Sequence, residues 1–293
     1  MDVHFGPAVP EDQRDDIESS IRAMAARSTE ERDKARAAEA RHQKLANAIN
    51  APLAKLVKQD SSAVSEFEDL LAQQKFEFDS ASILHPQEPI EVEEASLVVR
   101  TLGVKLETPP YPFDWKWHQL NGSAPYDTFL NRSRGAVGIE ARCGPLVPGS
   151  GGKFVNAHAG FGVFVRPTVS GILTCDSLRL MTWGYFVGAL GIGSNATVEG
   201  GVEHTIMEDG VFRAGGSHKL FRKRVSVDEV SSGHSQGVIA DSPMPVSFPV
   251  LAGHGYTFNV GAWVYADNTA GVGTSGAVAV IGGGFPSMTV NTP

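Results

Sequence analysis

A serine in the C-terminal third of the chain lies in a motif that many hydrolases use. Gly233, Ser235 and Gly237 match the G-x-S-x-G pattern, in which a sharp turn before a helix exposes a nucleophilic serine. Asp241 and His254 follow in the order acid, then histidine. The prolines that come soon after Ser235 oppose a helix there, and the three groups are too close in sequence for a hydrolase sheet to separate them. We therefore expect a polar turn and no enzyme, and a Ser235 hydrolase is the least favoured function.

The glycine pattern of nucleotide-binding proteins and the histidine spacings of metal sites do not indicate such sites in this sequence. The glycines of segment 271–276 fit the G-x-G-x-x-G pattern, but a β-branched run follows where a phosphate-binding helix would have to begin. The nine histidines show none of the HxH, HExxH or CxxC-type spacings of metal sites. We predict neither a cofactor nor a metal site.

The two cysteines and the first residues bear on the compartment. Cys143 and Cys175 are 32 positions apart, and the segment 1–20 carries acids where a signal peptide needs basic and apolar residues. We expect two reduced thiols rather than a disulfide. Without Sec-dependent export, the protein is expected in the cytoplasm, or in a particle that incorporates it without export.

A row of aromatic side chains is the first candidate binding surface. Tyr111, Phe113, Trp115 and Trp117 alternate with other residues, so in an extended chain all four rings lie on one face. Such a row could stack against the apolar faces of sugars. Rows of this kind more often fill a core or the join between two domains, which is the interpretation that we favour.

A basic cluster is the second candidate surface. Lys219, Arg222, Lys223 and Arg224 form the only such cluster in an otherwise neutral region. Regular strand alternation divides them between two faces, with Lys219 and Lys223 on one and Arg222 and Arg224 on the other. They could contact an anion, a partner or the acidic N-terminal helices, but protection of an edge strand against aggregation is the favoured explanation.

Charge and glycine divide the chain into two regions. The formal net charge is −8, from 25 Lys and Arg against 33 Asp and Glu, which argues against general nucleic-acid binding. Residues 1–100 hold 12 basic and 20 acidic residues, whereas 101–293 hold 13 of each. Glycine is absent between Gly6 and Gly103 and frequent afterwards. We expect a helical module at 1–82, a linker with one strand at 83–110, and a β domain at 111–293.

The helical module carries an apolar stripe with steps of four and three. It includes Ile17, Ile21, Met24, Leu45 and Ile49, with polar residues in its middle. This predicts either two helices, at 11–27 and 29–50, or one long helix with a weak centre, with a break at Pro52. The helices could pack on the β domain, which is the commoner use of such a stripe, or associate between chains as a bundle or short coiled coil.

The C-terminal region has the two-residue period of β-strands. Short apolar runs separated by glycine-rich turns predict an antiparallel β-sandwich or jelly roll, so the fold class is α+β in two parts. The strand predictions lie at 96–102, 135–141, 162–169, 182–190, 218–227, 244–250, 256–265 and 277–281. The apolar segment Met181–Gly193 is too short and too glycine-rich for a transmembrane helix, but suits either a buried strand or a membrane-inserting tongue.

These features favour a non-enzymatic, homo-oligomeric protein. Its helices would organise or tether the subunit, and its β-sandwich head would recognise a surface ligand, such as a glycan, or build a virion or other particle. The alternative is a soluble pore-forming or membrane-active protein.

Overall fold

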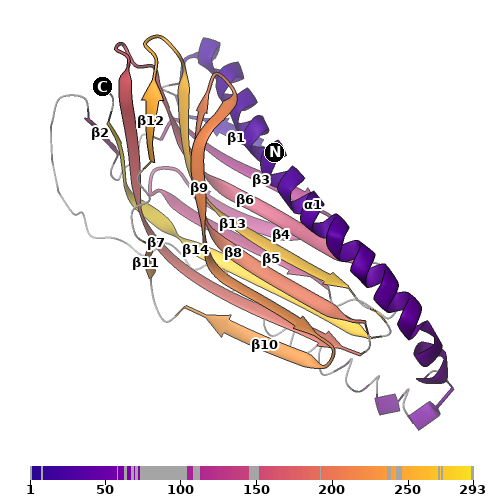
Figure 1. Ribbon diagram of the computed structural model, residues 1–293. Helices are drawn as coiled ribbons and strands as arrows, with labels where there is room; N and C mark the ends of the chain where they lie inside the picture. Colours follow the sequence, from indigo (N-terminus) through magenta and orange to yellow (C-terminus); the bar gives the residue numbers. More distant parts are fainter. Residues whose placement is uncertain are drawn as a thin grey trace.

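A single long helix and two open antiparallel sheets make up the computed structural model (Figure 1). Helix α1 spans Glu11–Val57, 47 residues, which corresponds to about 70 Å. The structure describes residues 2–7, 9–57, 59–62, 65–66, 69, 72, 104–107, 113–144, 152–191, 193–235, 239–241, 246–269, 271 and 273–291.

The first sheet, sheet A, has six strands among the described residues and takes its first strand from the N-terminus. Strand β1, which the sequence did not predict, pairs with β3 at the edge. In spatial order the strands are β1 (Asp2–Phe5), β3 (Trp115–Gly122), β6 (Lys153–Val165), β13 (Tyr256–Thr269), β8 (Asn195–Glu208) and β9 (Val211–Ser226).

The second sheet, sheet B, is built around two long strands, β7 and β14. The short strands β12, β11 and β10 pair in turn along β7, and β5 and β2 pair along β14. The strands are β10 (Glu229–His234), β7 (Gly171–Leu190), β14 (Thr274–Asn291), β5 (Ala136–Cys143), β4 (Tyr126–Asn131), β11 (Ile239–Asp241), β12 (Val246–Val250) and β2 (Val104–Glu107).

The main hydrophobic core lies between the facing sheets, as in a β-sandwich. Alternate residues point inward, so Val155, Phe161 and Val260 of sheet A meet Ile139 and Ile281 of sheet B. The predicted antiparallel sandwich is thus borne out at the level of two facing sheets. A jelly roll has eight strands in two Greek keys, and the strand order found here does not establish that topology.

Helix α1 lies on the outer face of sheet A, where a second core forms. Ile17 and Ile21 are completely buried there against Trp115 and Trp117. Glycine makes room for the rings, since a β-carbon at Gly162 of β6 would lie 2.3 Å from the Trp115 ring. Side chains of the helix and of sheet A are therefore buried against each other in one core.

Two expectations about the helix are resolved by this packing. The stripe forms one continuous helix, and its first half packs on the β domain. The predicted break at Pro52 is wrong, because the helix continues to Val57. A proline deprives a helix of one hydrogen bond and crowds the preceding turn, but does not always end it.

Most strand predictions overlap observed strands, from 135–141 on β5 to 277–281 on β14. The prediction at 96–102 lies outside the described residues. Among those residues, no helix is both long and apolar enough to cross a membrane.

Candidate functional site

The aromatic row is buried and divided between two cores. Phe113 stacks on Phe161 in the sandwich core, with ring centroids 5.0 Å apart, whereas Trp115 and Trp117 point outward beneath α1. All three side chains are 0% exposed, so no ring face is available to a sugar. The core interpretation is confirmed for these three residues, and the expectation of one shared face is wrong because Phe113 precedes β3. Tyr111 lies outside the described residues.

The basic cluster lies on β9, an edge strand of sheet A, and a bulge rearranges its faces. Gly200 pairs with Phe221, but the next residue, Gly201, pairs with Lys219, so Leu220 is the extra residue. The bulge reverses the alternation at this point. Lys219 therefore shares the outer face with Arg222, in contrast to the division that the sequence predicted.

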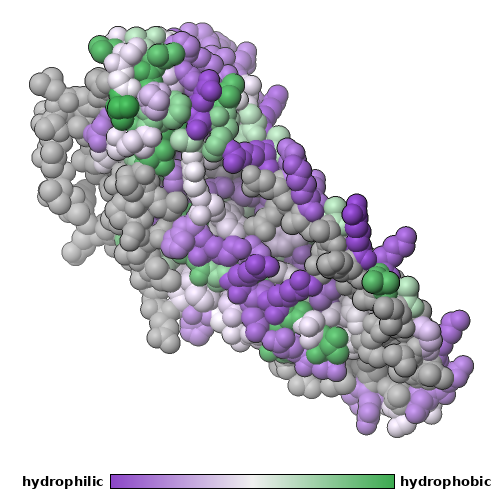
Figure 2. Space-filling view, viewed as in Figure 1, coloured by the Kyte–Doolittle hydropathy of each residue, from purple (hydrophilic) through white to green (hydrophobic). Residues whose placement is uncertain are grey.

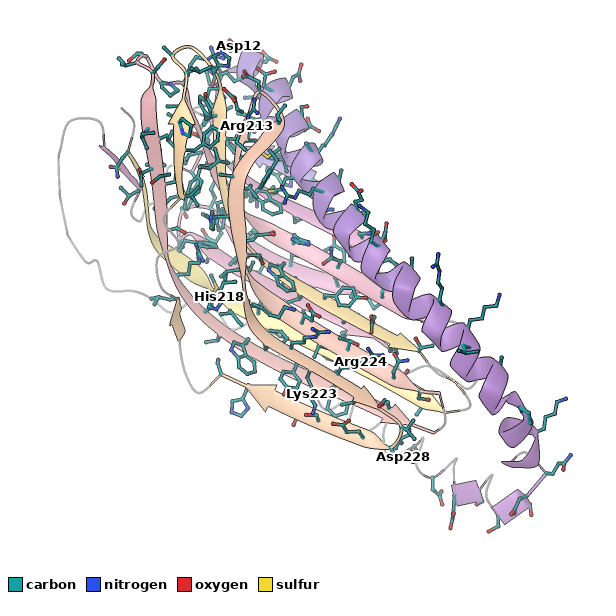
Figure 3. All side chains as sticks on the ribbon, in the orientation of Figure 1. Asp12, Arg213, His218, Lys223, Arg224 and Asp228 are labelled. Carbon is teal, nitrogen blue, oxygen red and sulfur yellow. The ribbon has the colours of Figure 1, made fainter. Side chains whose placement is uncertain are left out.

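Acidic neighbours surround the basic cluster. Lys219 Nζ lies 2.7 Å and Arg222 Nε 3.2 Å from the carboxylate of Glu199, a buried residue of β8. Lys223 bonds with Glu229 of β10, which raises the pKa of the lysine. Figure 3 shows Lys223 and Arg224 on β9 near the turn to β10. This arrangement supports the edge-strand explanation over an open anion site.

A histidine and a glutamate that the sequence analysis did not single out meet on the outer face of sheet A. His158 of β6 and Glu203 of β8 reach over β13, which separates their strands, and Nδ1 lies 2.6 Å from Oε1. Gly261 of β13 pairs with Glu203, and a β-carbon at Gly261 would lie 3.1 Å from the Trp117 ring. Both side chains are largely shielded from solvent, so the pair is suited to holding three strands together.

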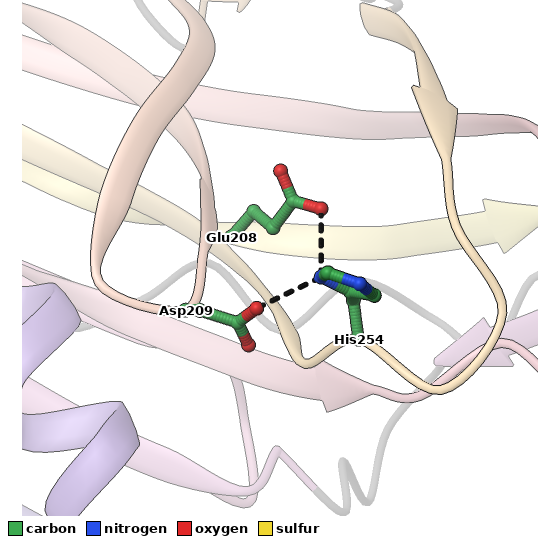
Figure 4. Close-up of side chains that lie close together, drawn as sticks. All are labelled: Glu208, Asp209 and His254. Atoms are coloured by element: carbon green, nitrogen blue, oxygen red, sulfur yellow. Dashed lines mark hydrogen bonds and ion pairs between the residues drawn. The ribbon is translucent and has the colours of Figure 1, made fainter.

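A second histidine cluster joins two turns at one end of the sandwich (Figure 4). His254 Nδ1 lies 2.9 Å from Asp209 Oδ2 and 3.3 Å from Glu208 Oε1. Asp209 also accepts a hydrogen bond from the Gly255 amide, and its own amide donates to the Gly255 carbonyl. These contacts fasten the β8–β9 turn to the loop before β13.

These three residues, Glu208, Asp209 and His254, could offer ligand atoms to a divalent cation, since the atoms lie within 4.8 Å of one another. Glu208 already has partners on both oxygens: Tyr256 donates to Oε1 at 2.6 Å, and Arg213 Nε lies 2.7 Å from Oε2. A cation would have to compete with the Arg213 guanidinium, so the geometry favours a hydrogen-bonded link between turns.

Ser235 directly follows strand β10 and is hydrogen-bonded to β7. Its amide donates to the Trp183 carbonyl at 2.8 Å, and its hydroxyl accepts from the Trp183 amide at 3.1 Å. His254, the histidine proposed to activate it, instead contacts Glu208 and Asp209. The side chain of Asp241 and residues 236–238 lie outside what the structure describes.

The apolar segment that begins at Met181 forms the second half of β7, between β14 and the β10–β11 edge. Met181, Val187 and Ala189 are fully buried, so the buried-strand interpretation is confirmed. Cys143 and Cys175 are both buried and form no disulfide, as expected. Burial raises the pKa of the Cys143 thiol far above its ordinary value, which keeps it unreactive.

The second half of α1 presents solvent-exposed side chains. Leu45 is 63% exposed, and the other described side chains from residue 41 onward are exposed as well. They are Arg41, Lys44, Ala48, Pro52 and Lys55. Figure 2 shows mainly hydrophilic surface along the edge of the molecule where α1 runs.

An apolar tip lies at the same end of the sandwich as the His254 cluster, since the His254 amide donates to the Leu251 carbonyl. Val169, Ile172 and Leu251 are 58%, 58% and 54% exposed. They come from neighbouring segments, since Gly171 pairs with Val250. Figure 1 shows the ends of β7 and β12 at the top of the molecule and the end of α1 at the bottom. Clustered exposed aliphatic residues are typical of contact surfaces.

Comparison with known proteins leaves the family open. No protein-family model matches the chain, and no curated protein matches it significantly. Solved structures that overlap with it include infectious bursal disease virus, Gx strain, with 10% identity and a TM-score of 0.14 over 69% of this chain and 40% of that chain. The T13 particle of the same virus gives 9% identity and a TM-score of 0.14 over 70% and 44%. The chain thus spans less than half of these proteins, and such scores do not establish a shared fold.

Proposed function

We propose that this protein is a non-enzymatic subunit of an oligomer or particle, in which helix α1 connects copies of the chain and the β-sandwich is the head. One observation carries the proposal. The first half of α1 is buried on sheet A, whereas Leu45 and the described side chains around it project into solvent. A continuous helix fixed at one end is suited to present its other end to a partner.

The chemistry of the described residues supports a structural role. The histidine pairs at His158 and His254 connect strands and turns, and the Ser235 hydroxyl accepts a hydrogen bond from the backbone of β7. The apolar tip around Ile172 supports the head function, because it offers a contact surface at the opposite end from Leu45. A surface ligand or a neighbouring subunit of a virion or other particle would bind there.

The test is the association state of the full chain, measured by light scattering after size exclusion. We expect an oligomer, and we expect Leu45→Glu to weaken self-association about tenfold or more, because burying a leucine at an interface contributes about 1.5–3 kcal/mol. Val230→Glu is the matched control, since Val230 is an exposed aliphatic residue of β10. A full chain that is monomeric at every accessible concentration would overturn the proposal.

A further inference from the structure

Charge is unevenly distributed along α1. Segment 11–18 holds five acidic residues and one arginine, whereas segment 41–57 holds three basic residues and no acid. The helix dipole favours acids in the first turn and bases in the last, but Asp16 and Lys44 lie beyond those turns. The dipole therefore does not account for the whole distribution.

Both charged segments are accessible on the described surface. The side chains of Asp12, Asp15 and Asp16 are exposed, although Ile17 beside them is buried on sheet A. Arg41, Lys44 and Lys55 are exposed as well. Figure 3 shows Asp12 at the start of the helix.

The middle of α1 offers room for a neighbouring helix. A groove of about 640 Å³ runs between residues 22–37 of the helix and Gln119 and Leu120 of β3. Its helical side includes the small residues Ala26 and Ala37, and its charges have both signs. Small side chains let two helix backbones approach closely.

We infer that two copies of the chain pair through α1 in antiparallel orientation, with the acidic start of each helix beside the basic end of the other. This inference rests on the proposed function and names the partner of α1. Parallel pairing would place Asp12 beside Asp12 and Lys55 beside Lys55, which repel. Antiparallel pairing brings opposite charges together at both ends and is selected by electrostatic complementarity.

The test is charge reversal, with association measured by sedimentation at low ionic strength. Arg41→Glu, Lys44→Glu and Lys55→Glu together change the basic end from +3 to −3, so that both ends are acidic. Asp12→Lys, Asp15→Lys and Asp16→Lys together change the acidic start from −4 to +2, so that both ends are basic. We expect each set of three changes to weaken self-association about tenfold or more, and all six together to restore it. The wild-type association is expected to weaken as salt rises from about 0.05 M to 0.5 M, because the charges are exposed.

Mixing the two variants gives a second, independent test of antiparallel pairing. The variant with two acidic ends and the variant with two basic ends should associate with each other more tightly than either does with itself. Arg134→Glu with Lys153→Glu is the control, because both residues are exposed charges outside α1. This control should self-associate like the wild type.

The outcomes separate the two proposals. A wild-type oligomer that is indifferent to charge reversal, or whose sixfold variant remains weakened, overturns antiparallel pairing and leaves the proposed function standing. Failure of the two triple variants to associate in the mixture also contradicts antiparallel pairing. A monomeric wild-type chain overturns both the proposed function and this inference.

Discussion

His204 and Arg179 place two basic side chains inside the sandwich. Arg179 is completely buried and its Nε donates to Ser177 Oγ, while His204 is 3% exposed and lies close to Phe258. Burial and the neighbouring Arg179 charge together lower the pKa of His204 to about 4, against the opposing effect of Glu203. The folded protein therefore holds His204 neutral at physiological pH.

This neutral histidine predicts a loss of stability in mild acid. Between pH 6.5 and about 4 the unfolded chain binds a proton at His204 and the folded chain does not, so the free energy of unfolding falls as pH falls. The shift corresponds to roughly 3 kcal/mol when complete. Urea unfolding across this range should show a shallower pH dependence for His204→Leu than for the wild type. The exposed His234 provides the control, and identical slopes for wild type and His204→Leu would contradict the prediction.

The turns between strands show which elements carry strain. Asp209 and Gly210 connect β8 to β9 with positive φ angles of 45° and 80°, as an Asp-Gly hairpin turn requires. The turn from β9 to β10 uses Val227 and Asp228, with φ of 36° and 59°. Valine is β-branched and is rarely found in this conformation.

Replacing Val227 should therefore stabilise the hairpin. Val227→Asn places a residue that tolerates positive φ at the first turn position, and Val227 is half exposed, so little burial is lost. We expect the free energy of unfolding to rise by about 1 kcal/mol, measured by thermal melting. Val230→Asn, on the neighbouring strand without positive φ, should give no gain. A lower melting temperature for Val227→Asn would show that the turn is not strained.

At the scale of the molecule, α1 is a part of the folded domain at one end and an exposed arm at the other. Gln119 of β3 donates to the Ala25 carbonyl and to Thr29 Oγ1, and the Thr205 hydroxyl donates to Met24 Sδ. These bonds, together with the buried Ile17 and its neighbours, hold the first half of α1 on sheet A.

Substitution by aspartate should then lower the free energy of unfolding strongly in the first half of α1 and hardly at all in the second half. Ile17→Asp buries a carboxylate against Trp115 and Trp117 and is expected to cost about 3 kcal/mol or more, with a red shift of tryptophan emission. Leu45→Asp should change the stability of the isolated subunit by less than about 0.5 kcal/mol. The measurement is chemical unfolding monitored by fluorescence. Equal losses of unfolding free energy in the two variants would mean that the two halves of α1 do not differ in burial.

Local pattern was sufficient for the division into a helix followed by strands. Period two located strands from β5 to β14, and the absence of glycine between Gly6 and Gly103 agreed with one long helix. The signals that were missed are also local. Asp209-Gly210 is a hairpin signature that would have placed the β8–β9 turn, whereas β1 is only four residues long and has no distinctive pattern.

The sequence by itself determined the order of a helical region followed by strands, because backbone preference and periodicity act over a few residues. It did not locate every strand, since β1, β3, β4 and β8 were not predicted. Only the tertiary structure decided what the side chains of the helix and strands face. The bulge at Leu220 moved Lys219 to the face of Arg222, and the crossing of α1 buried Trp115 while Leu45 remained in water. His158 met Glu203 because β6 and β8 pair with the two edges of the same strand, β13. Such contacts depend on strand order and register, which join residues distant in sequence and leave no local signal.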